Sequence, residues 1–209
     1  MIVLPRLYPI LDAGCFPDPR DLIAAAEDLI AAGCTLLQYR NKSGNARVML
    51  GQAQELRLQC RTGVSDPQIR LIMNDRADLC LAAEFDGVHV GQEDLSAEAV
   101  RRIIGAERWL GVSTHNPEQL REANLTSADY LAIGPVFATS SKERPDPVVG
   151  LEGVRRARAL TRRPLVAIGG ITRANAASVI EAGADSVAVI SDLVREPRKS
   201  AEEFFRILR

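Results

Sequence analysis

Short apolar segments alternate with longer amphipathic ones along the whole sequence, and this alternation limits the chain to a few folds. The apolar segments are four or five residues long, as are buried strands of parallel sheets. They lie at 7–11, 35–39, 70–73, 87–90, 109–112, 130–133, 164–168 and 186–190. Amphipathic segments predicted to be helices lie at 19–32, 46–61, 76–83, 96–104, 172–182 and 196–208, and another begins at Asn116.

A regular alternation of strand and helix predicts a parallel sheet with right-handed crossovers. Eight such units close naturally into a (β/α)8 TIM barrel of the α/β class. The alternative is an open doubly wound sheet, which usually carries a glycine-rich phosphate turn after its first strand. Here the first strand continues as Leu11-Asp12-Ala13-Gly14, without that turn. We therefore predict a TIM barrel and, because no linker is evident, a single domain over residues 1–209.

The overall charge argues against large anionic partners. The sequence has 26 basic and 27 acidic residues and a formal net charge of -1, so no global positive field favours nucleic acid or an anionic membrane. No signal peptide and no apolar run long enough to span a membrane are evident. The four cysteines form no CxxC pair, which argues against a disulfide framework or zinc site and favours a reducing cytoplasm. A local site for a small anion remains possible.

Polar residues gather where the predicted strands end. The plain turns lie between helix and strand, such as Glu181-Ala182-Gly183, so the two ends of the barrel differ in chemistry. Active sites of TIM barrels are built from the loops that follow the strands. These loops carry Asp12, Gln38-Tyr39-Arg40-Asn41-Lys42, Asn74-Asp75-Arg76, Gln92-Glu93-Asp94, Ser113-Thr114-His115, Thr139-Ser140-Ser141-Lys142, Gly169-Gly170-Ile171 and Ile190-Ser191.

The second of these loops predicts an anion site. Residues two apart share a face of a strand, so Gln38, Arg40 and Lys42 point together and Tyr39 points the other way. A solvated strand end is the alternative explanation for two cations side by side. It would predict similar clusters at both ends of the barrel. They occur at one end only, which favours the anion site.

Two carboxylates predict a metal site beside these cations. Asp75 and Asp94 follow adjacent strands and can face the same mouth, where like charges repel unless a cation lies between them. Oxygen ligands suit Mg²⁺, which keeps several waters and also binds phosphates. Each aspartate alone has a structural explanation, as a helix cap or a solvated turn. Together, beside Arg40 and Lys42, they predict a site for Mg²⁺ and a diphosphate.

A second anion site is predicted after the seventh and eighth strands, where TIM barrels often bind phosphate. Gly169-Gly170-Ile171-Thr172 is expected to open a helix, and glycine allows a ligand close to the backbone. Ile190-Ser191 supplies the neighbouring turn. His89 and His115 receive no catalytic role, because a histidine within or next to a strand is more often structural.

In order along the chain, these motifs resemble those of the thiamine phosphate synthase family, and the resemblance covers nearly the whole sequence. The family pattern reads QYRxK, NDR, DGVHxGQxD, GVSxH, a GPxxxTxTK-like loop, GGI and a closing IS. It is met at 38–42, 74–76, 86–94, 111–115, 134–142, 169–171 and 190–191. Ser141 stands where the family usually has Thr, and Asn41 replaces a common Glu.

The resemblance implies a transferase that joins 4-amino-2-methyl-5-hydroxymethylpyrimidine diphosphate to 4-methyl-5-(2-hydroxyethyl)thiazole phosphate, giving thiamine phosphate and pyrophosphate. It implies Mg²⁺ on Asp75 and Asp94, and catalytic roles for Arg40, Lys42, Ser113 and Lys142. Contacts to the pyrimidine diphosphate are implied for Gln38, Tyr39, Arg40, Asn41, Lys42, Asn74, Ser113 and Lys142. Contacts to the thiazole phosphate are implied for Thr139, Ser140, Ser141, Gly170, Ile190 and Ser191.

Two rivals and the oligomeric state remain open. A thiazole tautomerase shares the barrel but carries a histidine in the loop after the sixth strand, where this chain reads Gly134-Pro135-Val136-Phe137. A barrel that only binds a phosphorylated ligand would not need the Asp75 and Asp94 pair beside two cations. The expected partners are therefore small-molecule substrates, and a homo-oligomer is possible.

Overall fold

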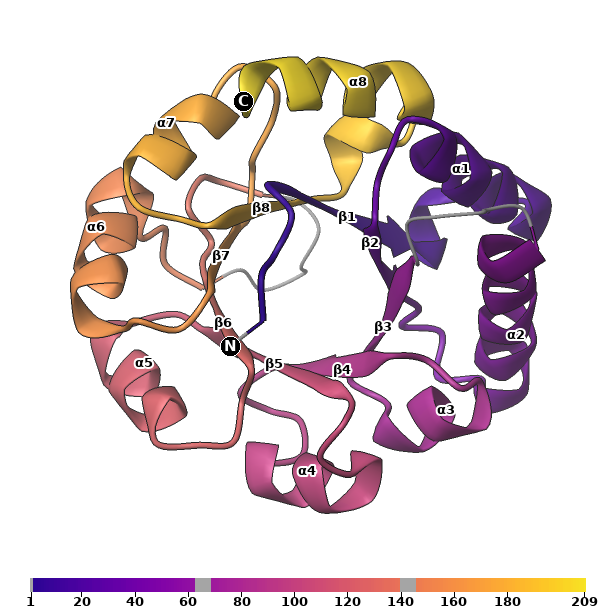
Figure 1. Cartoon of the computed structure of the whole chain (residues 1–209), viewed down its shortest axis with the longest axis horizontal. Helices are drawn as coiled ribbons and strands as arrows, with labels where there is room; N and C mark the ends of the chain where they lie inside the picture. The colour runs from indigo at the N-terminus through magenta and orange to yellow at the C-terminus, as the bar shows by residue number, and fades with distance from the viewer. Residues whose placement is uncertain (1, 63–68, 140–145) are drawn as a thin grey trace.

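The computed structural model describes residues 2–62, 69–139 and 146–209 and shows a (β/α)8 barrel, as predicted (Figure 1). Each strand pairs in parallel with the next, and the last strand closes on the first through the register Leu7 to Val187. The strands are β1 (Leu7–Asp12), β2 (Leu36–Arg40), β3 (Arg70–Asn74), β4 (Gly87–Val90), β5 (Trp109–Thr114), β6 (Tyr130–Ile133), β7 (Leu165–Ile168) and β8 (Ser186–Val189).

Helices form a ring around these strands (Figure 1). They are α1 (Pro19–Ala31), α2 (Ala46–Thr62), α3 (Ala77–Ala82), α4 (Ala97–Ile104), α5 (Pro117–Asn124), α6 (Gly150–Leu160), α7 (Ala176–Glu181) and α8 (Pro197–Ile207), with 3-10 turns η1 (Ala13–Cys15) and η2 (Ser191–Leu193). The N-cap side chains of Asp18, Ser96 and Asn116 accept backbone hydrogen bonds at the starts of α1, α4 and α5. These caps explain why those three helices begin where the sequence predicts.

The seventh helix is shorter than predicted. We expected it over 172–182, whereas α7 begins at Ala176. The side chain of Asn175 explains the difference, because its Oδ1 accepts a hydrogen bond from Thr172 N (2.8 Å) and its Nδ2 donates to Gly170 O (3.0 Å). Such side-chain bonds compete with helix formation. The glycine loop is therefore held as a turn and does not itself open a helix. No range was predicted for α6.

Alternate residues of each strand face opposite layers, and this fixes what points at the site. Odd-numbered residues of β1, such as Leu7 and Leu11, belong to the large core between the sheet and the helices. Tyr8 and Ile10 belong to a smaller cluster inside the barrel, with Leu4, Leu36, Ile72, Tyr130, Ala132, Val166 and Ala188. Gln38 and His89 are also buried. The barrel is therefore filled by side chains, as expected for this fold.

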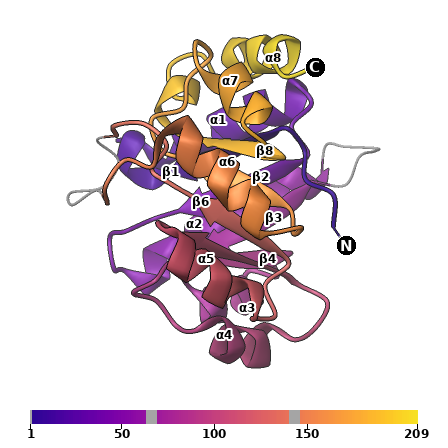
Figure 2. The same ribbon diagram turned by 90° about the vertical axis from the view of Figure 1, so that its left-hand side faces the viewer.

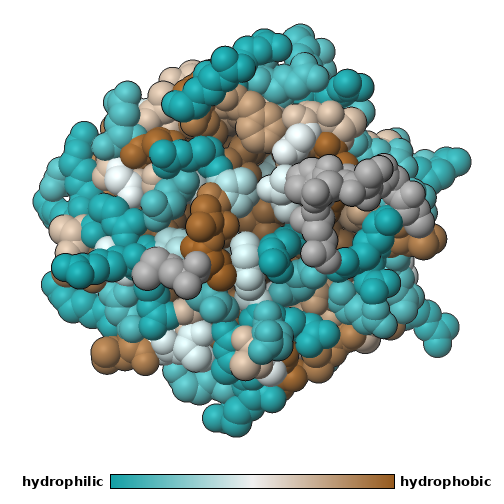
Figure 3. Space-filling model, in the orientation of Figure 1, coloured by the Kyte–Doolittle hydropathy of each residue, from teal (hydrophilic) through white to brown (hydrophobic). Residues whose placement is uncertain are grey.

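The end where the strands begin is covered by the N-terminal segment (Figure 2). Seen from that end, apolar atoms lie near the centre and hydrophilic side chains surround them (Figure 3). None of the described helices has the length and apolar character needed to cross a membrane. The polar residues predicted for the site line a cavity at the opposite end of the barrel.

Candidate active site

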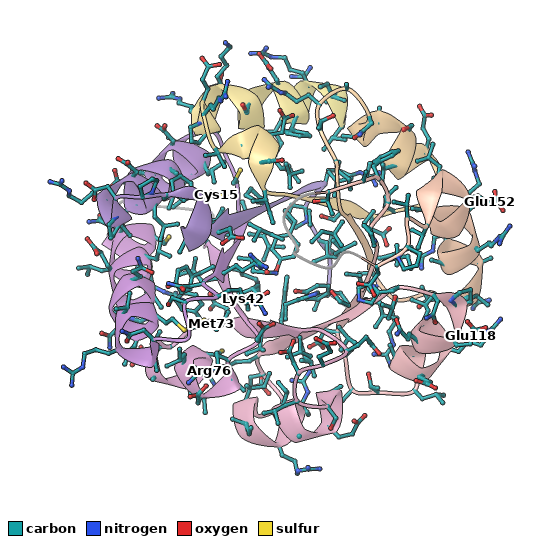
Figure 4. The ribbon with its side chains drawn as sticks, turned by 180° about the vertical axis from the view of Figure 1, so that it is seen from behind. Cys15, Lys42, Met73, Arg76, Glu118 and Glu152 are labelled. Atoms are coloured by element: carbon teal, nitrogen blue, oxygen red, sulfur yellow. The ribbon has the colours of Figure 1, made fainter. Side chains whose placement is uncertain are left out.

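A cavity of about 410 Å³ opens at the end where the strands finish. It has the size and the mixed polar and apolar lining of a small-molecule site. Figure 4 views the molecule from this end, with Lys42 directed toward the middle of the barrel. The predicted site residues on its wall are Gln38, Arg40, Lys42, Asn74, Asp75, Asp94, Ser113, Thr139, Gly170, Ile190 and Ser191. Ser140, Ser141 and Lys142 lie outside the described residues.

Tyr39 and Asn41 do not line this cavity. The Tyr39 hydroxyl donates to Gln52 Oε1 on α2 (2.6 Å), and Asn41 Nδ2 donates to the same oxygen (2.8 Å). Asn41 Oδ1 also accepts from Ser43 N (2.8 Å). These bonds attach the loop after β2 to α2. The two residues therefore lie behind the neighbouring cations, and the contact of Tyr39 with α2 confirms its expected outward direction.

Arg40 is held by Asp12, to which the sequence motifs assigned no role. Asp12 ends β1 directly opposite Arg40 in the register of the sheet, and its Oδ2 accepts a hydrogen bond from Arg40 Nη1. Its Oδ1 accepts from Gly14 N (3.1 Å), which fixes the carboxylate. Asp12 is 7% exposed, so the ion pair is partly shielded from water. A charged hydrogen bond of this kind positions the guanidinium at the cavity wall.

The two predicted metal ligands are neighbours. Burial raises the pKa of Asp75, the ammonium of Lys42 lowers it, and the adjacent Asp94 carboxylate raises it further, with a net rise. Lys42 Nζ lies 2.5 Å from Asp75 Oδ2, and Gly91 N donates to Asp94 Oδ2 (2.8 Å). Asp75 also has a positive φ of 62°, which is uncommon outside glycine, asparagine and aspartate.

This donor set fits Mg²⁺. Two adjacent carboxylates supply hard oxygen ligands, and Mg²⁺ commonly takes one or two carboxylates with waters and substrate phosphate completing the shell. No cluster of three or more acidic, histidine or cysteine side chains occurs within residues 2–62, 69–139 and 146–209.

The loops after β7 and β8 form the opposite wall. Gly170 has a φ of 62°, and a Cβ at this position would lie 2.4 Å from the carbonyl oxygen of Ala138. Only glycine fits this close approach of two backbones. Arg173 then joins the two loops, since its Nε and Nη2 donate to the two oxygens of Asp192 (both 3.0 Å) and its Nη1 donates to Glu203. This ion pair fixes Gly170 relative to Ser191.

A chain of buried polar side chains forms the floor of the cavity. His89 Nε2 lies 2.8 Å from Ser113 Oγ, and His89 Nδ1 lies 3.1 Å from the hydroxyl of Tyr130. That hydroxyl lies 3.1 Å from the hydroxyl of Tyr8, which accepts from Gln38 Nε2 (3.0 Å). Burial lowers the pKa of His89 to about 4, although the nearby Asp94 carboxylate opposes this. The imidazole is therefore uncharged near neutral pH.

Comparisons with known proteins agree with this geometry. The family model described as Thiamine monophosphate synthase matches residues 7–193. The chain belongs to this family. It is 58% identical over 208 residues to the thiamine-phosphate synthase of Koribacter versatilis, covering 98% of this chain and 96% of that one. It is 46% identical over 190 residues to that of Chloroflexus aurantiacus, covering 90% and 85%.

A solved structure adds a three-dimensional match. The thiamine phosphate pyrophosphorylase of Pyrococcus furiosus superposes with a TM-score of 0.84 at 33% identity, covering 97% of this chain and 95% of that one. The sequence motifs had implied the same family, so the predicted membership is confirmed. As a member of the thiamine monophosphate synthase family, the chain is a transferase.

Proposed function

We propose that this chain joins 4-amino-2-methyl-5-hydroxymethylpyrimidine diphosphate to 4-methyl-5-(2-hydroxyethyl)thiazole phosphate, giving thiamine phosphate and pyrophosphate. One observation carries the proposal: a single cavity has Arg40, Lys42, Asp75 and Asp94 on one wall and the Gly170 loop on the other. The first wall suits a diphosphate and the second a phosphate. The names of the relatives support the same reaction.

In the proposed reaction, the bond between the pyrimidine methylene carbon and the diphosphate oxygen breaks, and that oxygen takes the electron pair. The thiazole nitrogen then donates its lone pair to the same carbon. Negative charge therefore grows on the leaving group. Arg40 and Lys42 supply positive charge there, and the shielded ion pair with Asp12 holds Arg40 in place. Preorganised charge of this kind lowers the barrier, by about 3 kcal/mol per group.

Asp75 and Asp94 would hold Mg²⁺, which would neutralise part of the diphosphate charge when bound. Asn74 and Ser113 line the same side of the cavity and are proposed to contact the pyrimidine substrate. Ser113 is proposed as a catalytic residue because it ends the buried chain at the cavity. For Lys142, Ser140 and Ser141 the proposed contacts rest on the family motif alone.

The second substrate, the thiazole phosphate, is proposed to lie at the wall formed by the loops after β7 and β8. Thr139, Gly170, Ile190 and Ser191 would bind the thiazole phosphate through backbone and hydroxyl groups. We also propose a single catalytic domain over residues 1–209, a homo-oligomer in solution and a cytoplasmic location. Four free thiols, three of them buried, support the reducing compartment.

The test is pyrophosphate release from the purified protein. Both substrates are mixed with Mg²⁺, then with excess EDTA, and each substrate is omitted in turn. Mg²⁺-dependent release that needs both substrates, with an equal amount of thiamine phosphate, supports the proposal. Binding of thiazole phosphate without any turnover would instead identify a binding protein, and isomerisation of the thiazole without diphosphate use would identify a tautomerase.

Two separate lysine substitutions test the role of the Lys42 ammonium. Lys42→Met is expected to lower turnover about 100-fold, because it removes one charge from the leaving-group site. Lys199→Met is the matched control, since Lys199 lies on α8 and pairs with Glu196 three residues before it. Equal turnover in both variants would contradict the assignment of Lys42.

A further inference from the structure

The buried chain from Gln38 to Ser113 crosses the barrel interior and links five strands. It runs through Gln38 on β2, Tyr8 on β1, Tyr130 on β6, His89 on β4 and Ser113 on β5, with every link between 2.8 and 3.1 Å. Its three central members are at most 7% exposed, so their bonds are largely shielded from bulk water. Its two ends, Gln38 and Ser113, line the cavity.

Counting hydrogens gives this chain a direction. A phenol has one hydrogen to donate, and a neutral imidazole has one donor and one acceptor nitrogen. Tyr8 accepts from Gln38, so its own hydrogen goes to Tyr130. Tyr130 must then donate its hydrogen to His89 Nδ1. If Tyr130 donated to Tyr8 instead, the two hydroxyl hydrogens would face each other, and one of them would be buried without an acceptor.

The rest of the chain follows from this. With Nδ1 accepting, His89 carries its hydrogen on Nε2 and donates it to Ser113 Oγ. The hydroxyl hydrogen of Ser113 has no protein acceptor within the described residues and remains for a ligand. At the other end, Gln38 Nε2 is directed to Tyr8, which leaves Gln38 Oε1 as an acceptor at the cavity. The two ends therefore offer opposite polarity.

We propose that Tyr8, Tyr130 and His89 are positioning residues that hold Ser113 as a hydrogen-bond donor and Gln38 as an acceptor. This polarity matches a 4-aminopyrimidine edge, in which a ring nitrogen accepts beside an amino group that donates. It rejects a 4-oxopyrimidine, whose ring N–H donates beside a carbonyl that accepts. The inference rests on the proposed function and deepens it by naming the source of substrate discrimination.

The surrounding backbone is shaped around the chain. A Cβ on Gly111 would lie 2.2 Å from Tyr130 Cζ and 2.4 Å from His89 Nδ1. Glycine at this position of β5 is therefore what allows the tyrosine and the imidazole to meet. The rings of His89 and Tyr130 lie 5.5 Å apart at 31°, and those of Tyr8 and Tyr130 meet edge-on at 6.2 Å. Packing thus fixes the rings, and the hydrogen bond from Gln38 Nε2 to Tyr8 fixes the direction.

The first measurement is the tautomer of His89 by ¹⁵N NMR at neutral pH. The protein has two histidines, so the signals that remain in the His115→Gln variant belong to His89. We expect the wild-type protein to carry the His89 hydrogen on Nε2. Tyr130→Phe keeps the ring but removes the donor to Nδ1, and we expect the second tautomer to become populated. A wild-type His89 protonated on Nδ1 would reverse the chain and overturn the proposal.

The second measurement is the ratio of kcat/KM for the 4-aminopyrimidine diphosphate to that for its 4-oxo analogue. We expect Tyr130→Phe to lower this ratio at least tenfold. Thr114→Val is the matched control, because its buried hydroxyl (1% exposed) donates to Ala132 O (2.8 Å) on the helix-facing side of β5, one residue from Ser113. Equal ratios in Tyr130→Phe and wild type would overturn the proposal.

The two tests separate this inference from the proposed function. A wild-type protein that turns over neither pyrimidine contradicts the proposed function, and the His89 tautomer still decides the direction of the chain. A wild-type protein that makes thiamine phosphate but uses both pyrimidines equally contradicts only the inference.

Discussion

The buried imidazole of His89 makes the stability of this protein depend on pH in a predictable way. The pKa of His89 is lowered to about 4 in the folded protein, chiefly by burial, against 6.5 for an exposed histidine. As the pH falls, the unfolded chain therefore binds a proton before the folded one does. The contribution is fully present above about pH 6.5 and is lost as the pH falls from there toward 4. Between pH 7.5 and 5 it amounts to about 2 kcal/mol of unfolding free energy.

Urea unfolding at pH 7.5 and 5.0, on wild type and His89→Gln, tests this magnitude. Carboxylates and surface groups titrate in both proteins, so their effects cancel in the comparison. We expect the wild-type midpoint to fall by roughly 1 M more than that of the variant, for a slope of about 2 kcal/mol/M. His89→Gln is less stable at both pH values, but only the difference in slope with pH matters. Parallel behaviour of the two proteins would refute a neutral, buried His89.

Three further substitutions test the walls of the cavity in the pyrophosphate-release assay. Asp12→Asn should lower kcat/KM at least tenfold, because Arg40 loses the carboxylate that holds it; an unchanged value would contradict this. Gly170→Ala should raise the KM for thiazole phosphate about tenfold, whereas Gly105→Ala, with a similar positive φ but no atom within 4 Å, should not. Arg173→Lys keeps the charge but cannot bind two carboxylates as a fork, so only the KM for thiazole phosphate should rise, and a rise for both substrates would argue against a local role.

The sequence predicts the barrel well because its strands are short, apolar and evenly spaced. Parallel strands buried on both faces need this composition, and each predicted strand overlaps an observed one. Boundaries were less predictable where a polar residue ends a strand. The first strand continues to Asp12 and the fifth to Thr114, because ladder bonds to the neighbouring strand hold these residues whatever their polarity.

The direction of a site side chain could be predicted where it depends only on the position of the residue along its own strand. Alternation alone placed Gln38, Arg40 and Lys42 on the cavity and Tyr39 behind it. The ion pair between Asp12 and Arg40 was not predicted, since its partners are 28 residues apart and meet only through the register of β1 and β2. The sequence did contain a signal for this ion pair. Asp12 ends the first strand and Arg40 ends the second, and neighbouring parallel strands bring these ends together.

The buried chain of hydrogen bonds was harder to predict from the sequence, because its link between Tyr8 and Tyr130 joins residues 122 positions apart. Yet its position follows from a constraint of the fold. A closed barrel must fill its interior, and polar atoms there cost free energy unless each one is paired. Two phenols and an imidazole can be paired in a line only if all their hydrogens run the same way. The requirement that every buried polar atom at the floor of the cavity has a hydrogen-bond partner therefore also decides whether Ser113 donates or accepts at the cavity. In this barrel, core stability and substrate polarity would be set by the same hydrogens, so a substitution that reverses one of them should change both.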